Sequence, residues 1–131
     1  MDIPNYSLTL ALLPDRLMVC RLPAKAQIPD WVKFGDISAL IRTRDEFSIL
    51  CEDGAVPEGI LAERGWRALK VSGPLEFSMV GVLASLAMPL AQAGVSIFVV
   101  STYDTDYVLV KEFALPNALL VLCQAGHSII G

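Results

Sequence analysis

Residues Val71–Glu112 read VSGPLEFSMVGVLASLAMPLAQAGVSIFVVSTYDTDYVLVKE, and this stretch decides the fold. It predicts a strand, a glycine-bearing loop and a helix over Ser78–Ala93, with Gly94 as the helix cap. Two strands rich in β-branched and aromatic residues follow, with a turn at Asp104-Thr105 between them. These strands are expected at Val95–Tyr103 and Asp106–Glu112.

The first of these two strands is apolar on both faces. Ile97 and Val99 lie on one face, and Phe98 and Val100 lie on the other. A strand of this kind is typical of the middle of a sheet that is covered on both sides. The sequence therefore predicts a central strand here.

A membrane span is the main alternative for this stretch, because Met79–Val100 contains no charged residue. Pro89 and Gly94 interrupt the run, and its composition changes at Gly94 from helix formers to strand formers. No cluster of Lys or Arg flanks either end to set an orientation in a membrane. We therefore expect a helix followed by a strand, and no membrane partner.

Composition limits the possible classes of function. The chain has 131 residues, a net charge of −4 and 54% hydrophobic residues, which predicts one compact domain or two small packed ones. The ten basic residues are scattered, which argues against nucleic acid as a partner. The three cysteines show no CxxC spacing and resemble reduced core residues of a cytoplasmic protein. Residues 1–20 show no signal-peptide pattern.

Short strands and turns are expected in the rest of the chain, with Pro14-Asp15 as a turn between the first two strands. A second helix is expected from Leu115 to Ala125, capped by Gly126. The turn-rich run Asp53–Gly59 marks the boundary between a β-rich part, residues 1–62, and a βαββαβ part, residues 63–131. The predicted strands are Tyr6–Leu13, Arg16–Leu22, Ile37–Thr43, Phe47–Glu52, Gly65–Val71 and His127–Ile130.

Neither predicted helix carries a charged side chain, so both helices need cover on their outer faces. In the first helix the stripe facing the sheet is expected to be Leu83, Leu86, Ala87 and Leu90. Closed two-fold pairing is the commonest way to bury such surfaces. The sequence therefore predicts a homodimer.

Two motifs in this chain resemble the small ACT domain proteins of the CASTOR type: the helix motif GVLASLAMPLAQAG at Gly81–Gly94 and the hairpin motif STYDTDYVLVK at Ser101–Lys111. The run SALIRTRDEFSILCEDGAVPEG extends the resemblance into the N-terminal part. The resemblance implies an α+β, ferredoxin-like ACT fold at 63–131, packed with a degenerate ACT-like part at 1–62. CASTOR proteins are arginine sensors built from repeated ACT domains, and this chain resembles about half of one.

The resemblance also implies a ligand site between the loop Ser72–Val82 and the hairpin. It assigns to this site Met79, Val80, Gly81, Val82, Thr102, Tyr103 and Asp106. The N–H groups of 79–82 open a helix and suit a carboxylate, and Asp106 suits an ammonium. Where the arginine sensors have an acidic side chain, this chain has Met79, which implies an amino acid or similar zwitterion with a neutral side chain.

Other interpretations stay open at this stage. Asp106 could satisfy backbone N–H groups of the turn, and Gly81 could allow close packing of helix and strand. A structural or protein-interaction module without a ligand is the alternative function. An enzyme is not predicted, because no nucleophile motif, metal-ligand spacing or nucleotide-binding motif is present, and no cofactor is predicted either.

Overall fold

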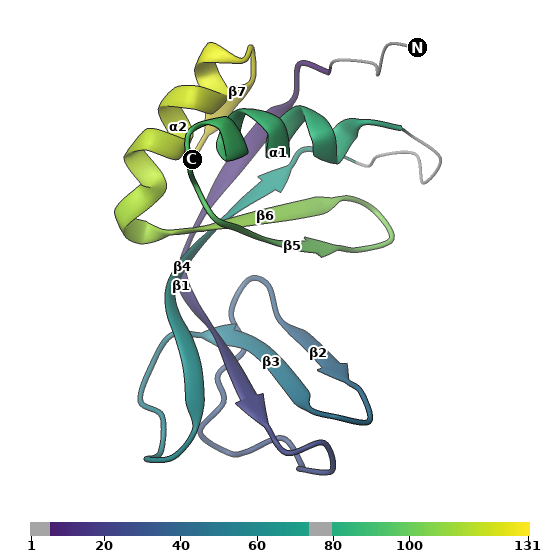
Figure 1. Ribbon diagram of the computed structural model, residues 1–131, viewed down its shortest axis with the longest axis vertical. Coiled ribbons are helices and arrows are strands. Elements are labelled where there is room, and N and C mark those ends of the chain that lie inside the picture. The colour runs from purple at the N-terminus through teal and green to yellow at the C-terminus, as the bar shows by residue number, and fades with distance from the viewer. Residues whose placement is uncertain (1–5, 74–79) are drawn as a thin grey trace. The chain divides into compact units, whose positions relative to one another are not determined.

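The computed structural model describes residues 6–73 and 80–131 (Figure 1). The chain divides into two compact units, one formed by Met1–Pro14 and Arg67–Gly131 and the other by Asp15–Trp66. The elements in chain order are β1 (Thr9–Leu22), β2 (Ala39–Arg42), β3 (Phe47–Glu52), β4 (Leu61–Val71), α1 (Val82–Gln92), β5 (Ile97–Ser101), β6 (Asp106–Lys111), the 3-10 helix η1 (Glu112–Ala114), α2 (Leu115–Gln124) and β7 (Ser128–Ile130). Strands β1 and β4 contribute residues to both units. The predicted boundary at 62/63 lies inside β4.

The unit that contains both helices has the strand order β7-β1-β4-β6-β5. From β4 to β7 the elements follow the order βαββαβ, so the predicted α+β, ferredoxin-like class is confirmed. The N-terminal strand β1 lies between the first and last strands of this motif. It pairs in parallel with β7, with Leu10 opposite Ile129.

Both helices of this unit pack on one face of its sheet (Figure 1). Alternate residues of each strand face the helices, as strand geometry requires. In β4 these are Leu69 and Val71, and in β6 they are Val108 and Val110. The helices contribute Leu86, Leu90, Ala118 and Leu122 to the same core.

Glycines end both helices where the sequence predicts it. Gly94 has φ 73° and Gly126 has φ 98°, a region that side chains disfavour. Behind Gly94, the N–H of Val95 donates to the carbonyl of Leu90 at 2.9 Å, which closes the helix in the usual C-terminal pattern. The predicted caps are therefore confirmed.

Four local predictions are wrong, and α1 begins at Val82, later than the predicted helix over Ser78–Ala93. Strand β1 runs without a turn through Pro14-Asp15, because proline's φ suits extended backbone and the Asp15 carboxylate accepts the N–H of Asp36 at 2.8 Å. Strand β5 is an edge strand, not a central one. The turn at Asp104-Thr105 is a four-residue loop, because Ser101 pairs with Asp106. Leu83 is 38% exposed, and Val82 takes its place in the core.

The unit Asp15–Trp66 contains the antiparallel pairs β1–β3 and β2–β3. Its core consists of residues on one face of these strands, among them Met18, Cys20, Phe47, Ile49 and Cys51. Arg42 closes one end of this core. Its guanidinium lies 3.9 Å from the centre of the Phe47 ring and donates to the carbonyls of Ala24 and Ala26.

Candidate functional site

The loop from β4 enters α1 through Gly81, whose φ is 87°. Val80 before it is exposed, and Val82 after it is buried. The hydroxyl of Ser85 donates to the carbonyl of Gly81 at 2.9 Å and accepts the N–H of Tyr6 at 3.2 Å. The first turn of α1 holds no acidic residue that could pair with its free backbone N–H groups.

The loop of the β5–β6 hairpin, residues 102–105, is fixed by its two threonines. The N–H of Thr102 donates to the carbonyl of Thr105 at 2.8 Å, and the N–H of Thr105 donates to Oγ1 of Thr102 at 3.2 Å. Thr105 is buried, and its Oγ1 donates to the carbonyl of Val71 at 2.7 Å. This last bond fastens the hairpin tip to the end of β4.

A hollow of about 290 Å³ lies beside this bond. It is lined by Lys70 and Gly73 from the end of β4 and the residues after it, and by Asp104 and Thr105 from the hairpin loop. Leu69 and Val71 face the helices, so Lys70 between them lies on the opposite face of the sheet. Its ammonium is 6.0 Å from the centre of the Tyr107 ring.

The structure brings together only some of the predicted site residues. Thr102 and the exposed Tyr103 belong to the loop that borders the hollow. Asp106 is half-buried and shares the face of Val108 and Val110, the face beneath the helices. Val80, Gly81 and Val82 lie at the start of α1. Met79 lies outside the described residues, as do the other residues of the predicted loop between 74 and 79.

Sequence reasoning missed Lys70 altogether. Gly73 lies within the predicted loop 72–82, and Asp104 and Thr105 lie within the predicted hairpin, but none of the three was singled out as a site residue. One signal was present in GWRALKV at 65–71. A lysine between Leu69 and Val71, just before a loop, places a cation on the helix-free face at the end of a strand. Thr105 closes the hollow through its hydrogen bond to Val71, and these two residues are 34 positions apart in the sequence, so no local pattern reveals the contact.

The single histidine has a structural role that its surroundings define. His127 is buried, its Nδ1 accepts the N–H of Leu8 at 3.1 Å, and its Nε2–H donates to the carbonyl of Ser85 at 2.9 Å. In a regular helix that carbonyl would accept the N–H of residue 89, but residue 89 is Pro and has none. His127 therefore replaces the missing helix hydrogen bond, and both ring nitrogens are occupied by backbone groups.

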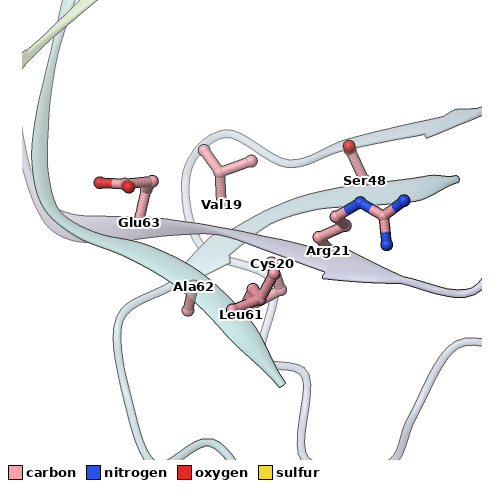
Figure 2. A pocket seen from close by; sticks show the side chains of 7 residues that line it. All are labelled: Val19, Cys20, Arg21, Ser48, Leu61, Ala62 and Glu63. Carbon is pink, nitrogen blue, oxygen red and sulfur yellow. The ribbon is translucent and has the colours of Figure 1, made fainter. Parts of the chain in front are cut away.

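A second hollow, of about 330 Å³, lies in the unit Asp15–Trp66 (Figure 2). Its charged lining residues are Arg21 and Glu63, and Figure 2 shows these two side chains pointing away from each other. Nε of Arg21 lies 3.7 Å from Glu46, which already compensates its charge in part. The polar groups do not converge, and none of the predicted site residues lines this hollow. The other lining residues are Val19, Cys20, Ser48, Leu61 and Ala62.

The described part of the chain offers little for catalysis or metal binding. Burial raises the pKa of Cys20, and it raises that of Cys51 to about 12, so neither thiol ionises near neutral pH. In residues 6–73 and 80–131, no group of three His, Cys, Asp or Glu side chains could hold a metal ion. None of the helices in these ranges is long and apolar enough to cross a membrane.

Comparison with known proteins shows which family models and solved structures this chain resembles. Residues 61–124 match the family model of the ACT domain, and residues 15–59 match a model described as an N-terminal domain. The chain contains an ACT domain. The crystal structure of protein Atu0741 from Agobacterium tumefaciens has 35% sequence identity to it and a TM-score of 0.87. That match covers 95% of this ACT protein and 93% of the Agobacterium chain.

The resemblance to the CASTOR type is confirmed as well. The human cytosolic arginine sensor for mTORC1 subunit 1 is 38% identical over 58 residues, which are 44% of this ACT protein and 18% of the sensor. The human protein CASTOR3P is 33% identical over 95 residues, which cover 60% of this chain and 56% of that one. The match thus spans less than a fifth of the sensor's length.

Proposed function

We propose that this ACT protein is a non-catalytic regulatory module that binds a small amino acid or a similar zwitterion. The observation that carries the proposal is the hollow between the end of β4 and the hairpin loop, fastened by the bond from Thr105 to Val71. It lies in the part of the chain that matches the ACT model. Small-molecule sites are usually concave, with few polar groups that fix the ligand's orientation.

Two sets of residues are candidates for the proposed site, one on each face of the sheet. The set expected from the sequence is Met79, Val80, Gly81, Val82, Thr102, Tyr103 and Asp106. Of its described members, Val80, Gly81 and Val82 lie at the start of α1, and the other three lie at the hairpin. The other set lines the hollow on the helix-free side. The arginine-sensor relative supports an amino acid as the class of ligand. The neutral Met79 supports a ligand whose side chain is not cationic.

A melting screen tests the proposed function. A ligand that binds only the folded state stabilises it by about 2.7 kcal/mol at a hundredfold excess over Kd. We expect at least one standard amino acid, added at about 10 mM, to raise the melting temperature by several degrees. If no amino acid shifts the melting temperature, the protein is better explained as an interaction module.

The same proposal includes a homodimer in the cytoplasm. Both helices lack charged residues, and Met88 of α1 and Leu120 of α2 are more than half exposed. Apolar helix faces of this kind are buried most simply by a second copy. Light scattering should give about twice the chain mass of 14.2 kDa. A Met88→Lys/Leu120→Lys variant should scatter as a single chain, and a wild-type protein that is already monomeric would contradict the dimer.

A further inference from the structure

The hollow beside the hairpin carries two opposite charges that do not neutralise each other. Lys70 and Asp104 both line it. Within the described ranges, the ion pairs involve other residues, and neither Lys70 nor Asp104 belongs to one. An ammonium and a carboxylate that line one hollow without pairing leave room between them for a molecule of complementary charge.

The frame around these two charges is firmly held. Lys70 is half-buried on β4, with its ammonium near the face of Tyr107. Asp104 lies in a loop whose ends are joined by the hydrogen bonds between Thr102 and Thr105. Thr105 in turn holds the loop against Val71, one residue after Lys70. The backbone that carries both charges is therefore in place before a ligand arrives, although the Asp104 side chain itself is exposed, and this lowers the entropic cost of binding.

We infer that Lys70 binds the carboxylate of the ligand and Asp104 binds its ammonium. The inference rests on the proposed function and adds the side chains that recognise the ligand. At about 290 Å³, the hollow lies at the lower end of the roughly 300–1,000 Å³ typical of ligand pockets, which suits a small amino acid. The ligand class is a free amino acid with both charged groups intact.

This arrangement differs from the one expected from the sequence in a testable way. Asp106 lies on the helix-facing side of β6, whereas Lys70 lies on the helix-free side of β4. A ligand held by the first turn of α1 and Asp106 would not depend on Lys70. A ligand in the hollow would depend on Lys70 and Asp104, and little on Asp106.

The test measures the affinity of the full chain by calorimetry, using the amino acid that gives the largest shift in the melting screen. Lys70→Met and Asp104→Asn are each expected to lower the affinity by at least about tenfold. Lys33→Met and Asp45→Asn remove the same charges from exposed positions of the other unit and should leave the affinity unchanged. Lys70→Gln serves as the second variant if methionine reduces the yield of folded protein.

Ligand analogues assign the two ends. In the wild type, both the decarboxylated amine and the deaminated acid should bind more weakly than the amino acid. Lys70→Met has lost the partner of the carboxylate, so it should bind the amino acid no more tightly than the decarboxylated amine. Asp104→Asn has lost the partner of the ammonium, so it should bind the amino acid no more tightly than the deaminated acid. An affinity of Lys70→Met within about twofold of wild type overturns the inference. A loss confined to Asp106→Asn also overturns it, but leaves the proposed function intact. A wild type that binds no amino acid refutes both.

Discussion

The bond between His127 and the helix carbonyl freed by Pro89 makes a quantitative prediction. Replacing His127 by Phe fills the ring's space but leaves two partly buried backbone groups, the Ser85 carbonyl and the Leu8 N–H, without their partners. A fully buried polar group left unpaired costs about 1–3 kcal/mol. Because these two groups are only partly buried, we expect the free energy of unfolding to fall by about 2–4 kcal/mol, below the full sum. This is a large part of the roughly 5–15 kcal/mol typical of a domain.

A double-mutant cycle tests whether Pro89 is the reason that the Ser85 carbonyl needs His127 as its hydrogen-bond donor. Pro89→Ala supplies an N–H four residues after Ser85, so the Ser85 carbonyl regains a helix donor. In that background His127→Phe leaves only the Leu8 N–H unpaired, and its cost should fall to about 1–2 kcal/mol. The coupling between the two positions is then about 1–2 kcal/mol, well above the few tenths expected of independent sites.

Urea unfolding of the four proteins of the cycle measures this coupling, with the m-value as a check that the unfolded state is unchanged. Pro116→Ala is the matched control, because Pro116 lies in the first turn of α2, where the missing N–H has no helix partner to bond. It should be additive with His127→Phe. Additivity of Pro89→Ala with His127→Phe would refute the explanation given for the histidine.

The other predictions concern thiols, pH and one arginine. Cys123 is exposed while Cys20 and Cys51 are buried, so a thiol reagent should label one site per native chain and three after unfolding; three fast sites would contradict the core assignment. Because burial raises the pKa of Cys51 from 9.0 to about 12, the native state keeps a proton that the unfolded state loses. The free energy of unfolding should therefore be unaffected by this group below about pH 9 and fall between pH 9 and 12, and Cys51→Ala should lessen the fall. Arg42→Met removes two hydrogen bonds and a ring contact, so it should lower the free energy of unfolding in urea by about 1–2 kcal/mol. The control Arg44→Met should leave this free energy almost unchanged. An equal loss in both variants would contradict the role of Arg42.

Local sequence was sufficient for most elements of the fold. The change of composition at Gly94 marked the end of α1, and Gly126 marked the end of α2, because both events depend on residues within one helical turn. The β-branched runs marked β5 and β6 for the same reason. Pairing between distant segments was not accessible in this way. The insertion of β1 next to β7 involves residues 119 positions apart, as in the bond from Leu8 to His127.

The candidate site, too, could be predicted only where it depends on residues that are close together in the sequence. The hairpin residues Thr102 and Tyr103 could be singled out from their own motif. The hollow could not be predicted in this way. It forms where Lys70 lies near Asp104 and Thr105, and these two residues come more than 30 positions later in the chain. Asp106 and Lys70 lie on opposite faces of the sheet, so a ligand on one face can reach only one of them. The face of each residue follows from the burial of its neighbours in the folded sheet, which the sequence does not state.

The parallel pairing of β1 with β7 constrains the order of events during synthesis. Residues 15–66 are continuous in the chain, so their unit can form while the rest is still being translated. The sheet of the unit that contains both helices cannot be completed until Ser128–Ile130 have been synthesised, although their partner residues in β1, Thr9–Ala11, come much earlier in the chain. Until then the edge of β1 at Thr9–Ala11 lacks its partner strand, and unpaired strand edges of this kind are prone to aggregate during folding.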